Sequence, residues 1–124
     1  MKVSEAAYIA GFIDGDGCIS VSYRPSRHGT GKIYPRVKIS VGQIVREPLD
    51  FMVLKLGVGK VYGPFPGNMK GNNTGKHDRY SYNLNGAQPV LRVLRILLPF
   101  LIVKRAKAEE VIALFHYSAP PTSC

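Results

Sequence analysis

The sequence switches repeatedly between strand-like and helix-like spacing of its hydrophobic positions. Two segments alternate strictly between apolar and polar residues, as strands with one buried face do, and two later segments repeat the pattern. Strands are therefore predicted over Cys18–Arg24, Tyr34–Gln43, Lys60–Phe65 and Arg79–Leu84. Apolar residues at helical spacing follow each pair of strands, and helices are predicted over Glu47–Leu56, Gln88–Leu98 and Lys104–Tyr117.

A further helix is predicted before the first strand. Ser4 is a plausible N-cap, and the turn-forming segment Asp14–Gly17 is predicted to end the helix. Small residues recur at every fourth position on one face, at Ala7, Gly11 and Gly15. Because glycine inside a helix costs about 1 kcal/mol relative to alanine, this bare face indicates close packing against another helix.

The order of elements is helix, hairpin, helix, hairpin, helix, helix. It predicts an α+β fold, αββαββα, in which one four-stranded antiparallel sheet is covered by helices on a single face. In the first hairpin, Ile19, Val21 and Tyr23 are expected to point into the core. The opposite face would be polar and positively charged, which suits the DNA major groove but is also common on sheets that bind nothing.

The charge of the chain favours a polyanionic partner. Among 124 residues, 17 lysines and arginines outnumber 8 aspartates and glutamates, giving a formal net charge of +9. From Cys18 to Arg46 inclusive there are six lysines and arginines and no acidic residues. The length and a hydrophobic content of 45% suit one domain, predicted over residues 1–117, with a flexible tail over 118–124.

Several function classes are disfavoured by what the sequence lacks. It contains neither a signal peptide nor an apolar run long enough to span a bilayer, so an intracellular protein is expected, cytoplasmic in a prokaryote or archaeon or within an organelle. Cys18 and Cys124 form no metal-ligand or multi-disulfide pattern. The three histidines lack the spacing of a zinc site and are assigned no chemistry.

The segment Tyr8–Gly17 joins the small-residue helix to two carboxylates. Within it, Ile9–Gly17 resembles the nine-residue signature of the LAGLIDADG homing endonucleases, with six of the nine positions identical. The similarity extends to Gln43, Leu56–Gly59 and Pro99–Lys104. This resemblance implies a saddle-shaped sheet with DNA on its open face, and a metal-dependent endonuclease that makes a double-strand break in a long pseudo-palindromic target.

The resemblance also implies roles for individual residues. Asp16 matches the metal-binding aspartate, and Gly15 matches a position whose backbone carbonyl contacts metal. The implied cofactor is Mg²⁺, with Mn²⁺ as a substitute and Ca²⁺ supporting binding without efficient cleavage. Asp14 is expected to have a structural role at the helix end. The implied catalytic residues are Asp16, Gln43, Lys104 and Arg46, the last in a segment that is shorter here.

The sequence also leads us to expect two interfaces, one with a second copy of the chain and one with DNA. Because one motif supplies one essential carboxylate, two chains are expected to share the metals as a homodimer. The dimer interface is expected at Ala7, Ala10, Gly11, Asp14 and Gly15. Contacts to double-stranded DNA are expected from the polar sheet face and its loops, at Ser20, Ser22, Arg24, Arg27, Lys32, Tyr34, Arg36, Lys38, Ser40, Lys60, Tyr62, Lys70, Lys76, Arg79, Ser81 and Asn83.

Two alternatives stay open at this point. An intron maturase of the same fold would bind its host intron RNA and assist splicing. A non-catalytic DNA-binding protein would keep the fold without cleaving. The presence of Asp16, Gln43 and Lys104 together favours cleavage.

Overall fold

The computed structural model describes residues 1–25, 33–66 and 77–118 of the chain. The helices are α1 (Val3–Asp16), α2 (Glu47–Leu56), α3 (Ala87–Leu97) and α4 (Arg105–Ser118), with a short 3-10 turn, η1 (Leu98–Phe100), after α3. The strands are β1 (Gly17–Pro25), β2 (Ile33–Gln43), β3 (Lys60–Phe65) and β4 (Arg79–Asn85). The predicted order is confirmed, and outside α1 the predicted element ends differ from the observed ones by one residue at most.

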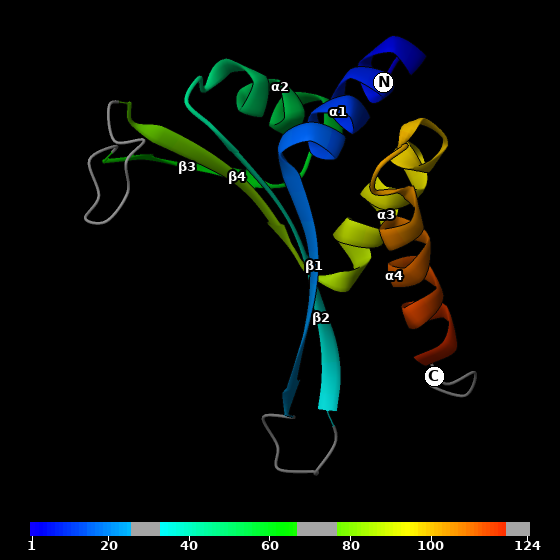
Figure 1. The fold of residues 1–124 in the computed structure, drawn as a ribbon. Coiled ribbons are helices and arrows are strands. Elements are labelled where there is room, and N and C mark those ends of the chain that lie inside the picture. Colours follow the sequence, from blue (N-terminus) through cyan, green and yellow to red (C-terminus); the bar gives the residue numbers. More distant parts are fainter. Residues whose placement is uncertain (26–32, 67–76, 119–124) are drawn as a thin grey trace.

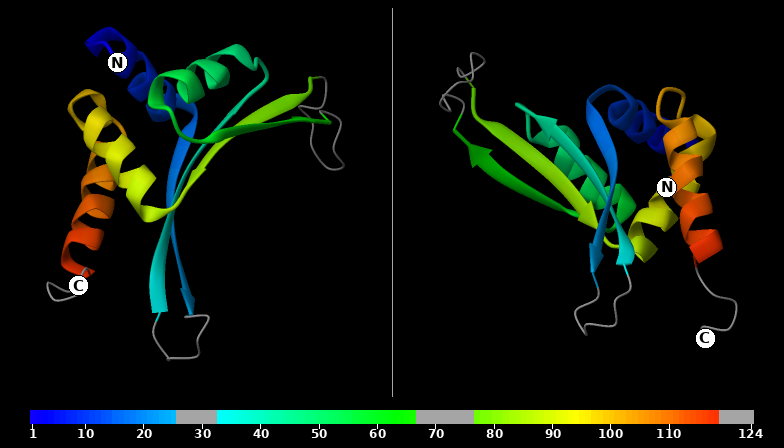
Figure 2. Two further views of the ribbon diagram at one scale, coloured as in Figure 1. Left: turned by 180° about the vertical axis from the view of Figure 1, so that it is seen from behind. Right: turned by 60° about the horizontal axis from the view of Figure 1, so that its bottom comes forward.

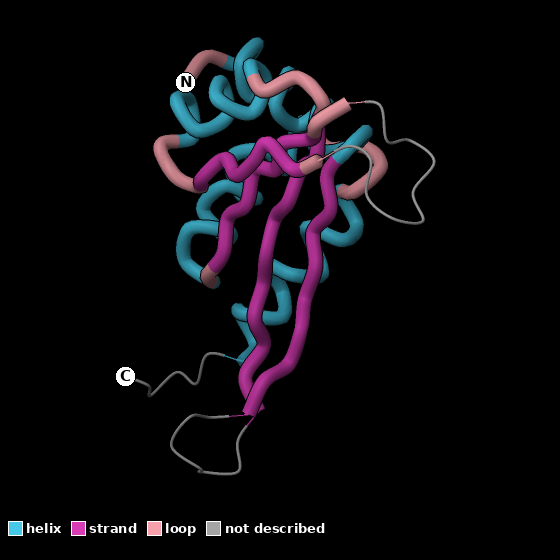
Figure 3. Tube along the Cα trace, turned by 90° about the vertical axis from the view of Figure 1, so that its left-hand side faces the viewer, coloured by secondary structure: helices cyan, strands magenta, loops and turns pink. Residues whose placement is uncertain are grey.

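The strands form one antiparallel sheet in the order β1-β2-β4-β3. Figure 1 shows this sheet strongly twisted, with α1 and α2 above it and α3 and α4 to its right. The reverse view in Figure 2 shows the same one-sided arrangement, and in Figure 3 the strands face the viewer with the helical layer behind and above them. The α+β class is therefore confirmed, and none of the described helices lies over the other face of the sheet.

The core lies between the sheet and the helices. Alternate residues of the two central strands, including Ile39 and Tyr82, point into it and are fully buried. From α1, the core receives a single stripe at helical spacing, formed by Ala6, Ile9, Ala10 and Ile13. Each fully buried aliphatic side chain in this layer contributes roughly 1.5–3 kcal/mol of transfer free energy. These contacts fix the orientation of α1 above the sheet.

Both ends of α1 differ from the prediction. The helix begins at Val3, and the predicted cap at Ser4 is wrong, because the backbone N–H of Lys2 donates to Glu5 Oε1 at 2.8 Å and the capping group is the Glu5 carboxylate. At the other end the helix continues through Asp16 and then passes directly into β1. Gly17 permits this, since a Cβ there would lie 2.8 Å from backbone atoms of Ile13.

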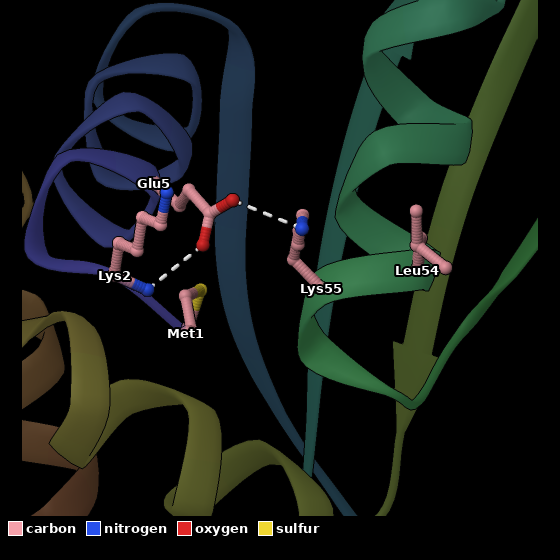
Figure 4. A pocket seen from close by; sticks show the side chains of 5 residues that line it. All are labelled: Met1, Lys2, Glu5, Leu54 and Lys55. Atoms are coloured by element: carbon pink, nitrogen blue, oxygen red, sulfur yellow. Dashed lines mark hydrogen bonds and ion pairs between the residues drawn. The ribbon is translucent and has the colours of Figure 1, made fainter.

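Glu5 also connects α1 to α2. Its Oε2 atom pairs with Lys55 Nζ at 2.9 Å, and Figure 4 shows this bridge at the edge of a hollow of about 560 Å³. The hydrogen bond from the Lys2 backbone and the Lys55 ammonium hold the pKa of Glu5 below its ordinary value. This hollow lies near the start of α1, at the opposite end of the helix from Asp16.

The position expected for Tyr23 is also wrong. Its side chain is 60% exposed, although it alternates correctly with Ile19 and Val21. Tyr23 pairs with Pro35, whereas β4 pairs with β2 only from Lys38 to Gln43. The outer part of the β1–β2 hairpin therefore extends beyond the other two strands, where strand periodicity persists without a core beneath it.

Within the three described ranges, no helix combines the length and the apolar character needed to cross a membrane.

Candidate active site and nucleic-acid interface

The last residue of α1 and the last residue of β2 meet at one point. Because Gly17 pairs with Val41, the start of β1 brings the end of α1 beside the end of β2. There, Gln43 Nε2 donates a hydrogen bond of 2.6 Å to Asp16 Oδ2. Asp16 is exposed, so its carboxylate is held in place by Gln43 while it remains accessible to solvent.

Asp14 holds a second segment against the same end of α1. Its Oδ2 accepts from the Ile102 backbone N–H at 2.7 Å and its Oδ1 from the Lys104 N–H at 2.9 Å. Partial burial alone would raise the pKa of Asp14, but these backbone donors, with that of Val103 and the Lys104 charge, hold it below the ordinary value of 3.8. Asp14 therefore joins the segment that contains Ile102 and Lys104 to the end of α1.

Two basic residues were expected near the carboxylates, and the structure places them differently. Lys104 Nζ donates to the Asp14 backbone carbonyl at 2.8 Å, which puts a positive charge at the last turn of α1. Arg46 precedes α2, pairs with Asp50 at 3.2 Å and lies over the Tyr80 ring at 5.8 Å from its centroid. The Arg46 charge is thus engaged with α2 and β4.

The oxygen atoms at this point suit a hard cation but are few. The Asp16 carboxylate and the Gly15 carbonyl at the end of α1 are ligand types that Mg²⁺ prefers. Among the residues that the structure describes, no group of three or more His, Cys, Asp or Glu residues is placed to hold a metal ion. One chain therefore fits the chemistry of the ion while providing only part of a ligand set.

The open face of the sheet is lined by basic, hydroxyl and amide side chains. Cross-strand pairs such as Ser22–Arg36, Ser20–Lys38 and Ser40–Asn83 extend over β1, β2 and β4, and the described strands contain no aspartate or glutamate. The predicted residues that lie on this face, exposed or half-buried, are Ser20, Ser22, Tyr34, Arg36, Lys38, Ser40, Lys60, Tyr62, Arg79, Ser81 and Asn83. A hollow of about 380 Å³ lies within it, beside Arg36 and Lys38.

Five predicted DNA contacts are not described in full. Arg27, Lys32, Lys70 and Lys76 lie outside the described residues. The backbone of Arg24 pairs with Tyr34 in the hairpin, but its side chain belongs to the part that is not described.

Comparison with solved structures identifies the fold. A crystal structure of the homing endonuclease I-CvuI with its target in the presence of 2 mM Ca matches 91% of the chain with a TM-score of 0.71 and 28% identity. The archaeal intron-encoded homing endonuclease I-Vdi141I, complexed with DNA, matches 91% with a TM-score of 0.69 and 23% identity. The I-LtrWI LAGLIDADG homing endonuclease, bound to target DNA, matches 90% with a TM-score of 0.64 and 17% identity.

The chain has the LAGLIDADG homing endonuclease fold. It spans 66% of the I-CvuI chain, 67% of the I-Vdi141I chain and 37% of the I-LtrWI chain. No protein-family model and no curated protein matches the sequence.

In this LAGLIDADG fold, the small-residue face of α1 is open. Ala7, Gly11 and Gly15 are exposed, and a Cβ added at Gly11 or Gly15 would have no heavy atom within 4 Å outside its own helix. Ala10 was expected at the same interface, and this is wrong. It is fully buried in the core of its own chain, one turn from Ala6 and Ile13.

Sequence reasoning missed one residue of the open sheet face. Asn85 lies opposite Lys38 and lines the hollow beside Arg36. The signal was present, because the alternation of Arg79, Ser81 and Asn83 reaches Asn85 if β4 is extended by one residue.

Proposed function

We propose that the protein is a site-specific DNA endonuclease that acts as a homodimer and cleaves both strands of a long pseudo-palindromic target by divalent-metal-dependent phosphodiester hydrolysis. The observation that carries this proposal is the hydrogen bond between Gln43 and Asp16. It joins an accessible carboxylate to the edge of a basic, acid-free sheet face, so that a phosphate held over that face would lie near a metal ligand.

The open sheet face is suited to duplex DNA. The major groove is wide enough to admit strands, and side chains at alternate positions would reach base edges. Arg36, Lys38 and Arg79 would contact phosphates or guanine edges, and Asn83 an adenine edge. The same charges would draw the polyanion to this side of the molecule.

The homodimer follows from the number of carboxylates. Asp14 is occupied by backbone donors, so each chain contributes Asp16 alone, whereas a two-metal site needs ligands from two sides. A two-fold axis running along α1 would bring the two Asp16 carboxylates together. An axis perpendicular to α1 would place them near opposite ends of a helix about 21 Å long. The exposed glycines of α1 would let the two helices approach closely in the first arrangement.

Within this proposal, each residue has a defined task. The Asp16 carboxylate and the Gly15 carbonyl would hold Mg²⁺, which when bound lowers the pKa of water and stabilises charge on the phosphate. Gln43 would keep Asp16 in its ligand orientation. Lys104, at the last turn of α1, would place positive charge near the scissile phosphate. The catalytic role of Arg46 stays a prediction.

The test begins with selection of a cleaved site from randomised duplex DNA. With that site, cleavage should require Mg²⁺ or Mn²⁺, while Ca²⁺ should support binding only. Asp16→Asn should abolish cleavage and keep the dissociation constant for DNA within about threefold, because it removes a ligand charge and leaves the sheet face unchanged. Glu109→Gln, at an exposed carboxylate on α4, is the matched control and should cleave normally.

Two results would overturn the endonuclease assignment. One is undiminished cleavage by Asp16→Asn. The other is tight binding of structured intron RNA with no selectable DNA site, which would favour the maturase alternative. Specific DNA binding without any cleavage across the divalent ions would instead indicate a non-catalytic member of the fold.

A further inference from the structure

The two sides of the α1 small-residue face differ in shape. On one side Tyr8, half-exposed, packs edge-on against Phe51 of α2 with ring centroids 5.5 Å apart. Tyr8 and Phe51, together with Val45, Pro48 and Glu47, line an open groove of about 480 Å³. Apart from Glu47, the lining of this groove is largely apolar, and no described helix or strand covers it.

On the other side, two aliphatic side chains project from the surface. Ile102 is 83% exposed and Val103 is 73% exposed, in the segment that joins η1 to α4. This segment is held firmly, since the Asp14 carboxylate accepts hydrogen bonds from the Ile102 and Lys104 backbones. This anchored backbone thus presents two adjacent hydrophobic side chains to solvent. Because they are exposed, packing within one chain does not explain their presence.

Helix geometry places these features on opposite flanks. Tyr8 is three residues before Gly11 and Asp14 three residues after it, so they project about 60° to either side of Gly11. A two-fold axis parallel to α1 turns one flank of a chain toward the opposite flank of its partner. The projection at Ile102 of each chain would therefore face the groove at Tyr8 of the other.

The two features also lie at matching heights along α1. Val45 follows Gln43, which bonds to Asp16, so the groove reaches the C-terminal end of the helix. Ile102 is bonded to Asp14 at the same end. The surface area of a stable dimer interface also requires contacts beyond the glycine stripe. Such an interface buries about 1,200–2,000 Å² in total, whereas a stripe of two glycines and an alanine offers little apolar side-chain surface.

We infer that the dimer is held together mainly by two reciprocal contacts, in each of which Ile102 and Val103 of one chain pack into the groove formed by Tyr8, Val45, Pro48 and Phe51 of the other. The occupant of the groove is a second copy of this chain. The inference rests on the homodimer of the proposed function and adds the part of its surface that supplies affinity.

A single acidic substitution tests the projection. Ile102→Asp should fold as the wild type does, because the side chain is exposed in one chain, and this is checked by circular dichroism and thermal unfolding. In the dimer it would place a carboxylate in an apolar groove beside Glu47, so sedimentation equilibrium should show the dimer dissociation constant raised at least about 100-fold. Ile33→Asp is the matched control: it is 64% exposed at the start of β2, at the end of the hairpin farthest from α1 in Figure 1, and should dimerise normally.

A complementary pair of variants tests which flanks meet. Tyr8→Lys should also be monomeric alone, since it puts a charge in the groove. Mixed in equal amounts with Ile102→Asp, it should form a heterodimer within about tenfold of wild-type affinity, with one native contact and one Asp–Lys contact. If like flanks met instead, the mixed dimer would contain neither a native contact nor an Asp–Lys contact. Its affinity would then stay well outside tenfold of the wild type, and the inference would be overturned.

The outcomes separate this inference from the homodimer itself. A wild-type chain that is monomeric both free and on its cleaved target would contradict the proposed dimer. A dimeric wild type whose Ile102→Asp variant remains equally dimeric would leave the proposed function standing and overturn the reciprocal contacts alone.

Discussion

The side-chain amide of Gln43 donates a 2.6 Å hydrogen bond to the carboxylate of Asp16, although 27 residues separate them in the sequence. The bond connects the end of the motif helix to the end of a sheet strand that carries basic side chains on its open face. The proposed metal ligand Asp16 and the proposed DNA-binding face of the sheet are thereby joined within one chain. Changes at Gln43 should therefore affect cleavage and binding differently.

Gln43→Ala should lower the single-turnover cleavage rate by about 10–100-fold, because loss of a group that orients a metal ligand typically has this cost. Its dissociation constant for the target in Ca²⁺ should stay within about threefold of wild type. Titrating Mg²⁺ should show a higher requirement in the variant. Gln88→Ala, at an exposed glutamine on α3, is the control, and equal cleavage by both variants would remove Gln43 from the site.

The open sheet face makes a separate prediction about salt. Arg36→Ala and Lys38→Ala should each reduce the steepness of log affinity against log salt by about 1.8 in the homodimer, if each of the two copies of the side chain neutralises one phosphate. If either reads a guanine, site preference should also relax by about 1–3 kcal/mol at one position. Arg95→Ala on α3 provides a charge-matched control. Unchanged slopes and site preference in both sheet variants would place the DNA elsewhere.

Most of the fold was predictable because local patterns agreed with the global arrangement. Alternation defined the strands and helical spacing defined the helices. The predicted end of α2 at Leu56 is also observed, and Gly57 after it adopts a φ of +75°, which favours glycine. The burial of Ala10 could also be predicted from the sequence, because Ala10 lies one helical turn from Ala6 and Ile13. The motif resemblance implies an interface at Ala10, whereas the periodicity of the helix indicates a place in the core.

Other features left no signal in the sequence. The donors to Asp14 are backbone N–H groups almost 90 residues away, and every residue but proline has one, so neither composition nor spacing identifies them. The Ser4 cap failed for a similar reason, because the Glu5 carboxylate could reach the Lys2 backbone just as well. The exposure of Tyr23 depends on where β4 stops, which is a property of strand register.

The Asp14 contacts predict a change in acid stability. Because its pKa is lowered in the folded chain, the stability it contributes is present above the unfolded value, near 3.8, and is lost as pH falls through the folded pKa. Asp14→Ala should lower the free energy of unfolding by about 1–3 kcal/mol at pH 7, since it leaves backbone donors unpaired. The difference from wild type should shrink below about pH 4.

Denaturant titrations at several pH values measure this effect. Asp78→Ala, at an exposed carboxylate, is the control for a general loss of one negative charge. A difference between Asp14→Ala and wild type that stayed constant down to pH 2 would contradict an electrostatic origin. The same variant should also expose the 102–104 segment to faster hydrogen exchange, because its anchoring acceptor is gone.

Two glycines of the motif should respond to substitution in opposite ways. A Cβ at Gly11 meets open space in one chain, whereas a Cβ at Gly17 meets the backbone of Ile13 at 2.8 Å. Gly11→Leu should therefore leave the unfolding free energy of the monomer unchanged or raise it by about 0.5–1 kcal/mol, since leucine is a better helix former. Gly17→Ala should lower it by about 1–3 kcal/mol through overpacking.

For dimerisation and cleavage, Gly11→Leu should be the damaging substitution and Gly17→Ala the tolerated one. Gly11→Leu should be monomeric by sedimentation equilibrium and inactive even though Asp16 is intact, because added atoms prevent two α1 helices from approaching closely. Gly17→Ala, assayed well below its melting temperature, should still dimerise, since the added methyl group would contact Ile13 of its own chain. A Gly11→Leu variant that stayed dimeric and active would show that the two chains do not meet through this face, and the shared site would have to be abandoned.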